Sequence, residues 1–397
     1  MTVLSTTAPS TVVLAGRPRA RLGLIVAALL LAPGLLAGCA ASGGHATTTT
    51  PAPAATAPLA TSMTTADGQA WAIVAMGGPA AQEDLFWELI TRPPGSDRWT
   101  LVTPPGVADN GGLVAAGTSG PLTVGFEPSQ DLTFSPLATT GNGGKTWDAG
   151  LLNAHLASVP DAIAANGTGM LALLDDGAID QASTGAGGWA PLAAPGAIAA
   201  SAAGRRCQVT GLAAVAYTPS GTPLAAAACA RPGSTGIFAR VAGTWQASGP
   251  ADPGGQPLRV IRLTQAPAGD TALLQAGTSG AGSLSAAWTG NGAQWTASPA
   301  LPLHGAKVQA SGTGPGGALW VLLSGDRAET LTGPGAAWRE LPAPPRGTAA
   351  LAANSDGTYD ALVVSAATLT IDQVTADGSG WRAEQVTKVP VQYGSSS

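Results

Sequence analysis

Seven tryptophans recur along the chain, and each follows a short turn that contains glycine. They are Trp99, Trp147, Trp189, Trp245, Trp295, Trp338 and Trp381. Neighbouring members are 42 to 56 residues apart. Upstream of each lies an apolar run, such as AWAIVAM or ALWVLLSG, and then, in several copies, a run of alternating polarity, such as DLFWELIT or TLTIDQV. A recurrence of this length predicts a repeated supersecondary unit.

The repeat length and the strand pattern together predict an all-β fold, a seven-bladed β-propeller of four-stranded antiparallel blades. Alternating polarity suits a strand whose two faces pack differently, whereas a short continuous apolar run suits a strand buried on both faces. We predict that the seven turn tryptophans act as wedges, meaning large rings that pack between adjacent blades. Gly 55 and Pro 32 among 397 residues agree with a fold that has many turns.

A propeller must join its first and last blades, because otherwise two sheet edges stay open. The first repeat begins almost directly with DGQAWAIVAM and has no recognisable inner strand before it. The last repeat is followed by KVPVQYGSSS, for which no further blade remains. We therefore expect residues 388–394 to supply the inner strand of blade one, so that the propeller spans residues 66–395.

One turn, TTGNGGKTW, resembles the Asp-box of sialidase-like propellers. Its pattern positions are Thr140, Asn142, Gly144, Thr146 and Trp147, with Asn in place of the usual Asp. A short side-chain oxygen at Asn142 can accept backbone N–H groups inside the turn, and Gly144 permits a positive φ. The other six copies keep mainly the glycine and the tryptophan, so the resemblance is specific at one site.

The sialidase resemblance implies an arginine triad and a tyrosine paired with a glutamate, and neither is recognisable. The nearest arginine motif, Thr91-Arg92-Pro93-Pro94, lacks the aromatic residue of the family pattern. His155 and His304 are the only histidines of the folded body, so we predict no metal site and no cofactor. We expect a non-catalytic protein. The alternative is a sialidase-like or other glycoside hydrolase, whose paired carboxylates need only meet in space.

Two cysteines, Cys207 and Cys229, flank two apolar runs that surround a Pro-Ser-Gly turn. In an exported chain an even pair predicts a disulfide. The alternative, a redox or metal pair, lacks a CxxC spacing and a neighbouring histidine.

The amino terminus has the layout of a signal peptide, with three arginines before an apolar run from Leu22 to Gly38. The run ends in Leu36-Ala37-Gly38-Cys39, which resembles the bacterial lipoprotein motif and implies a lipid on Cys39. We expect a signal peptide over residues 1–38 and a disordered Thr/Pro/Ala-rich tether over residues 39–65. The predicted location is the extracytoplasmic face of a bacterial cell membrane, with the anchor as membrane contact.

The chain is acidic, with a formal net charge of -5, which argues against nucleic acid as a partner. Six cations nevertheless precede or begin predicted inner strands, and they are Arg205, Arg206, Arg259, Lys307, Arg346 and Lys388. We predict that they partly encircle the central funnel and attract a protein or anionic glycan ligand. The alternative is that these loops simply carry charges. We expect a monomeric binding module; an assembly factor like the photosystem propellers is a third possibility.

Overall fold

The computed structural model describes residues 61–388, apart from residues 66–67, 77–85, 105–111, 117–120, 127–131, 168, 186, 251–254, 267–268, 278–281, 291–293 and 366–367. The predicted signal peptide, Cys39, most of the predicted tether and residues 389–395 lie outside the described residues. Among the described residues, no helix is long and apolar enough to cross a membrane.

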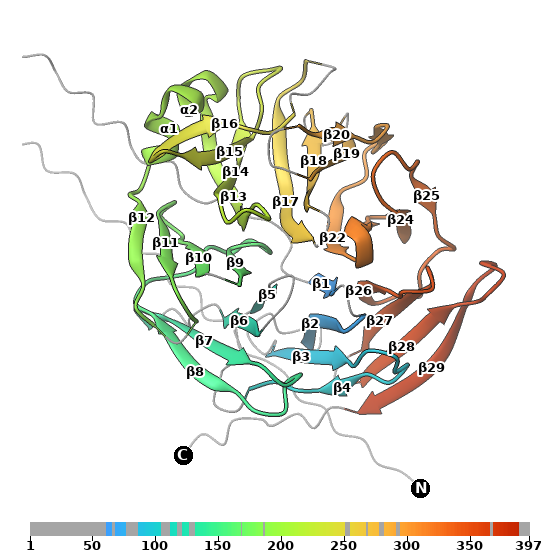
Figure 1. Ribbon diagram of the computed structural model, residues 1–397. Coiled ribbons are helices and arrows are strands. Elements are labelled where there is room, and N and C mark those ends of the chain that lie inside the picture. Colours follow the sequence, from blue (N-terminus) through green and yellow to red (C-terminus); the bar gives the residue numbers. More distant parts are fainter. Residues whose placement is uncertain are drawn as a thin grey trace, which may run out of the picture. The chain divides into compact units, whose positions relative to one another are not determined.

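The strands form consecutive antiparallel units in which each strand pairs with the next one along the chain (Figure 1). The first units comprise β1 (Thr61–Thr64), β2 (Ala70–Met76), β3 (Phe86–Arg92) and β4 (Thr100–Leu101); β5 (Gly112–Ala116), β6 (Leu122–Phe126), β7 (Ser135–Thr140) and β8 (Asp148–Leu152); and β9 (Ile163–Asn166), β10 (Gly169–Leu173), β11 (Ile179–Ala182) and β12 (Ala190–Ala193).

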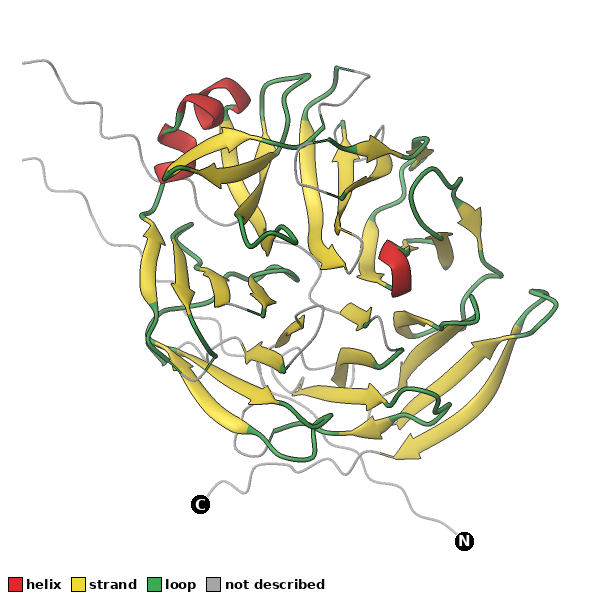
Figure 2. Cartoon of the chain, viewed as in Figure 1, coloured by secondary structure: helices red, strands yellow, loops and turns green. Residues whose placement is uncertain are grey.

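The later units follow the same order, and short helices lie between β12 and β13 and before β23 (Figure 2). These units comprise β13 (Val209–Tyr217), β14 (Pro223–Cys229), β15 (Ile237–Val241) and β16 (Thr244–Ala247); β17 (Leu258–Ala266), β18 (Gly269–Ala276), β19 (Ser283–Thr289), β20 (Thr296–Ala297) and β21 (Leu301–Pro302); β22 (Val308–Thr313), β23 (Leu319–Leu323), β24 (Arg327–Leu331) and β25 (Arg339–Glu340); and β26 (Thr348–Ala353), β27 (Tyr359–Ser365), β28 (Thr368–Val374) and β29 (Trp381–Lys388). The helices are α1 (Ala197–Ala200), α2 (Ala202–Cys207) and a 3₁₀ turn, Pro315–Gly317.

The units lie around a common centre, with the first strand of each unit toward the centre and the last strand at the rim (Figure 1). Burial follows this order. Every residue of β6, β10 and β23 is buried, which agrees with their continuous apolar sequences. Residues of the rim strand β29 are exposed or half-buried, and they include long polar side chains such as Arg382 and Glu384.

The hydrophobic core lies between neighbouring units. One cluster joins Trp71 and Leu89 of the β1–β4 unit to Val124 of the β5–β8 unit. Another joins Leu273 of the β17–β21 unit to Val321 of the β22–β25 unit. Since each cluster takes side chains from adjacent sheets, a single unit cannot bury its faces alone, and the ring is one cooperative structure.

The inner place of the first unit is occupied by β1. Its four residues pair antiparallel with β2 from Thr61↔Ile73 to Thr64↔Ala70. The prediction that residues 388–394 supply this strand is therefore wrong, and the globular body begins inside the predicted tether. Lys388 ends β29 at the rim and pairs with Thr368. β1 could not be recognised from the sequence, because TSMT contains no apolar run.

Two buried hydroxyls attach β1 to the last unit. Ser62 donates a hydrogen bond to the carbonyl of Leu351, and Thr64 donates one of 2.9 Å to the carbonyl of Ala353. Both acceptors belong to β26. These bonds add to the apolar packing at the junction, so short polar side chains serve here as core residues.

A buried ion pair strengthens the same junction. Arg92, at the end of β3, lies 2.7 Å from Asp360 of β27, and both side chains are almost fully buried. The indole nitrogen of Trp99 donates to the same carboxylate at 2.9 Å. Asn354 and Gln373 donate to its other oxygen at 3.0 and 3.2 Å. The Asp360 carboxylate is thus fully satisfied where the first and last units meet.

Candidate functional site

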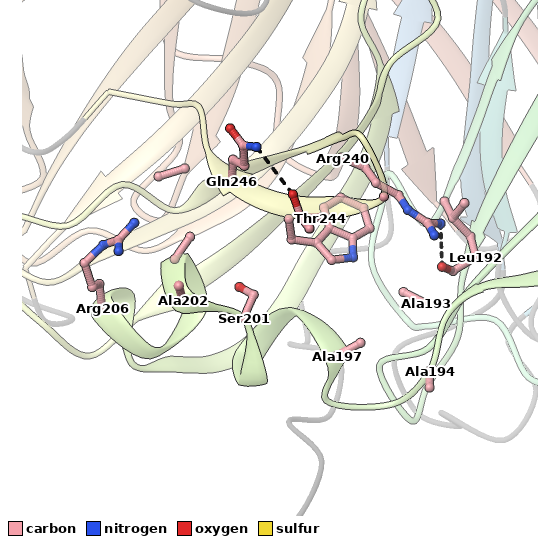
Figure 3. Close-up of a pocket in the computed structure, with 14 residues that line it drawn as sticks. Leu192, Ala193, Ala194, Ala197, Ser201, Ala202, Arg206, Arg240, Thr244 and Gln246 are labelled. Carbon is pink, nitrogen blue, oxygen red and sulfur yellow. Dashed lines mark hydrogen bonds between the residues drawn. The ribbon is translucent and has the colours of Figure 1, made fainter.

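A groove of about 730 Å³ lies at the rim between β12, the two helices and the β15–β16 hairpin (Figure 3). Small apolar residues form much of its wall, and Ser201, Thr244 and Gln246 add polar atoms. The volume falls within the range of roughly 300 to 1,000 Å³ that is typical of small-molecule sites. The groove is therefore large enough for an extended ligand.

The helices form because the segment after β12 is rich in alanine, which is the best helix former. Ser201 separates them and caps α2, since its hydroxyl accepts a hydrogen bond of 2.9 Å from Gly204 N. Glycine is required at 204, because a Cβ there would lie 1.9 Å from the Ile198 carbonyl oxygen. This close contact holds α1 against α2 and shapes one wall of the groove.

A disulfide fixes the end of α2. Cys207 is bonded to Cys229, the last residue of β14, as the sequence predicted. The ladder of β13 and β14 contains two register shifts, so this strand pair is irregular beside the disulfide. The disulfide anchors the helix pair to the neighbouring unit and so fixes the groove wall.

Two arginines line the groove. Arg206 belongs to α2 and is exposed, and Arg240 belongs to β15, where its Nη1 donates to the Leu192 carbonyl at 2.5 Å. Figure 3 shows both side chains at the groove. Among the described residues, the lining contains no Asp or Glu. Trp245, which is 8% exposed, completes it. Arg240 had no sequence signal, because it lies inside a strand.

The six predicted cations do not share one location. Arg205 and Arg206 lie on α2, and Arg206 is the one that lines the groove. Arg259 lies near the start of β17, where burial lowers its pKa. Lys307 and Arg346 directly precede the inner strands β22 and β26, as expected. The assignment of Lys388 to an inner strand is wrong, because this residue ends the rim strand β29.

The turn tryptophans contact the unit that precedes their own at several junctions. Trp147 packs edge-on against Trp71, with 6.5 Å between ring centroids. Trp338 and Trp381 donate their indole N–H groups to the carbonyls of Pro299 and Pro342, at 3.1 and 3.0 Å.

The remaining turn tryptophans also lie at junctions. Trp99 reaches Asp360 of the last unit. Trp189 and Trp245 contribute to one cluster that extends from β7 to β16, and Trp295 packs against the cluster between β13 and β19.

The turn at Thr140 has the geometry that its sequence favours. Thr140 Oγ1 accepts from Gly144 N, and Asn142 Oδ1 accepts from Thr146 N, both at 3.0 Å. Gly143 and Gly144 have φ values of 73° and 84°. These bonds shape the hairpin that leads to Trp147.

A second turn, before Trp381, has the same kind of hydrogen bonding, although its sequence does not fit the Asp-box pattern. Asp377 accepts from Ser379 N at 3.0 Å and from the Thr375 hydroxyl at 2.6 Å. These hydrogen bonds, first of all that from Thr375, lower the pKa of Asp377 to about 2. The signal Thr-x-Asp-Gly-Ser-Gly-Trp is one residue shorter than the turn at Thr140, which explains the failure to align them.

The centre of the ring holds a second buried ion pair that the sequence did not reveal. Arg262 of β17 donates to both oxygens of Asp161 at 2.7 Å and to the Ser311 carbonyl of β22 at 2.6 Å. Asp161 lies just before β9 and also accepts from Leu263 N at 2.9 Å. One guanidinium therefore connects three units near their inner strands.

The radial arrangement of antiparallel units around one centre defines a β-propeller protein, which confirms the prediction of an all-β propeller. The chain is similar in structure to the GH74 xyloglucanase from Xanthomonas campestris, with a TM-score of 0.54 and 16% identity over 84% of this chain and 55% of that one. This chain therefore spans little more than half the length of the xyloglucanase.

Two other propellers match over nearly their whole length. A candidate 6-phosphogluconolactonase from Bacteroides uniformis has a TM-score of 0.50 and 14% identity over 81% of this chain and 97% of that one. YCF48 from Cyanidioschyzon merolae has a TM-score of 0.44 and 12% identity over 85% and 96%. At these identities the likeness shows the fold alone. No protein-family model matches the sequence, and no curated protein matches it.

Proposed function

We propose that this protein is a lipid-anchored, extracytoplasmic, seven-bladed β-propeller that binds an anionic glycan in the groove beside α2. The observation that supports this function is that Arg206 and Arg240 both line a groove whose described residues include no carboxylate. In a chain with 18 basic and 23 acidic residues, two guanidinium groups without an acidic neighbour favour an anionic ligand.

The chemistry of the groove suits an acidic sugar. Guanidinium groups bind carboxylate and sulfate-like groups through paired hydrogen bonds. Ser201, Thr244 and Gln246 offer hydroxyl and amide groups to sugar hydroxyls, and the alanines supply apolar surface. We favour binding over hydrolysis because a glycosidase of the usual kind needs two carboxyl groups beside the ligand, and the described part of the groove lining has none.

The test is calorimetric titration of the full chain with uronate-containing or sulfated oligosaccharides and with their neutral counterparts. We expect binding of the acidic sugars alone. The double variant Arg206→Ser/Arg240→Ser should weaken it by about tenfold or more, since each charged hydrogen bond contributes roughly 1.5 to 3 kcal/mol.

The matched control is Arg346→Ser, which removes an exposed cation that the funnel hypothesis would use. An equal loss in this control, or equal binding of neutral sugars, would contradict the groove as the site. Preferential binding of acidic peptides over acidic sugars would instead identify a protein partner and refute the glycan assignment.

The anchor is inferred from Leu36-Ala37-Gly38-Cys39 and has its own test. Replacing Cys39 with Ser should move the protein from the membrane fraction to the soluble fraction of a lipoprotein-processing bacterium, because the lipid attachment site is lost. Unchanged membrane association of the Cys39→Ser protein would refute lipidation at this residue.

A further inference from the structure

A second cavity, of about 220 Å³, lies between the β17–β21 and β22–β25 units. Its buried floor includes Asp270, Thr271 and Trp288, and its exposed rim includes Gln294 and Pro334. The volume is below the usual range for a whole small-molecule ligand and suits a group of side-chain size. Gly317 keeps the space open, because a Cβ there would lie 2.8 Å from Thr271 Oγ1.

Asp270 is the unusual residue of this cavity. It is 1% exposed, and among the described residues neither of its carboxylate oxygens has a hydrogen-bond partner. The hydroxyl of Thr271 beside it also has none. Burial raises the pKa of the Asp270 carboxyl to about 8. The segments 267–268, 278–281 and 291–293, which lie outside the described residues, contain no Lys or Arg. No cation is therefore close to Asp270 in the sequence.

The same chain shows how such a carboxylate is satisfied elsewhere. Asp270 and Asp360 are both the second residue of the second strand in their units. Asp360 receives the Arg92 guanidinium, which also lies 5.5 Å from the centre of the Trp99 ring. Asp360 lies in the β26–β29 unit, and Arg92 comes from the β1–β4 unit, which follows it around the ring. In the same way, the β22–β25 unit follows the β17–β21 unit, which contains Asp270.

Three of the four donors to Asp360 have no counterpart at Asp270 among the described residues. Arg92 is the last residue of β3, and the last residue of β24 is Leu331. Gln373 pairs with Asp360 in the ladder, whereas Thr289 pairs with Asp270. The indole nitrogen of Trp338 donates to Pro299, whereas that of Trp99 donates to Asp360. The second site thus keeps the carboxylate and lacks the guanidinium.

We propose that the cavity at Asp270 binds a guanidinium group from outside the chain, the side chain of an arginine in a partner protein or of a free arginine-like molecule. The carboxylate would accept the planar pair of N–H donors, as Asp161 does from Arg262. Thr271 Oγ1 would accept a further N–H group, and Trp288 would contribute an aromatic wall.

The test is titration calorimetry of the full chain at pH 7 with N-acetyl-arginine methylamide, free arginine and N-acetyl-citrulline methylamide, the neutral isostere. We expect the capped arginine to bind at least about tenfold more tightly than the capped citrulline, because a charged hydrogen bond is lost in the latter. Binding of the capped form alone indicates a peptide side chain. Equal binding of free arginine indicates a small-molecule ligand.

Proton release gives an independent readout. The Asp270 carboxyl is mostly protonated at pH 7 and must ionise to pair with a guanidinium, so about one proton should be released per site. The other lining residues in the described part of the chain carry no titratable side chain. Titrations in two buffers of different ionisation enthalpy measure this number. Binding without proton release would overturn the proposal.

Asp270→Asn keeps the shape of the side chain and removes its charge, so it should weaken capped-arginine binding at least about tenfold. Asp148→Asn, which removes an exposed carboxylate from β8, should leave binding unchanged, and so should the groove variant Arg206→Ser/Arg240→Ser. Equal binding by the wild type and Asp270→Asn, or equal binding of citrulline and arginine, would mean that the cavity holds only water.

Discussion

At the scale of single residues, three buried aspartates among the described residues differ in their side-chain partners. Asp161 and Asp360 are each paired with an arginine from another unit, at 2.7 Å in both cases. Asp270 has no partner among the described residues. A buried carboxylate without a partner is strongly disfavoured, so paired aspartates can be structural while an unpaired one points to a ligand.

The Arg262–Asp161 pair leads to a prediction about stability. Replacing Arg262 with Met should lower the free energy of unfolding by about 3 to 5 kcal/mol, because it leaves the Asp161 carboxylate buried and uncompensated. Urea denaturation at neutral pH measures the change. The matched control is Arg382→Met, which breaks the surface pair of Arg382 and Glu384, where the arginine side chain is 72% exposed. That control should lose at most about 1 kcal/mol. Equal losses would contradict a structural role for the central pair.

At the scale of elements, the sequence predicted what depends on local pattern. Continuous apolar runs located β2 and β23, and the glycine turns located the hairpins before Trp147 and Trp381. The propeller class followed from the spacing of such turns. These features could be recognised because the strand pattern and the turn residues recur at a similar interval.

Elements whose stability comes from distant partners could not be predicted in this way. The four residues of β1 resemble the tether in sequence, and they join the core through pairing with β2 and through hydroxyl bonds to β26, 289 positions away. Arg262 and Asp161 are 101 positions apart. Arg240 faces the groove because α1 and α2 fold over it, and the alanine-rich sequence of those helices gives no sign of a binding wall.

At the scale of the whole molecule, closure of the ring combines backbone pairing with buried polar bonds. β1 adds a strand to the first unit and bonds by its side chains to the last one. The Arg92–Asp360 pair joins the third strand of the first unit, β3, to the second strand of the last unit, β27. Since the core clusters lie between units, opening this junction exposes apolar surface on both sides and weakens every remaining junction.

If β1 closes the ring, changes in β1 should lower the free energy of unfolding more than removal of the carboxyl terminus does. In the full chain, Ser62→Ala/Thr64→Val should lower the free energy of unfolding by about 1 to 3 kcal/mol, because two buried hydrogen bonds to β26 are lost. Deletion of residues 389–397 should change it by less than about 1 kcal/mol, since the inner place beside β2 is already filled. Thr100→Val removes a hydroxyl from an exposed residue of β4, and it controls for the loss of a hydroxyl group outside the junction. Thermal and urea unfolding measure all three. If the deletion proves more damaging than the double substitution, closure depends on the carboxyl-terminal segment.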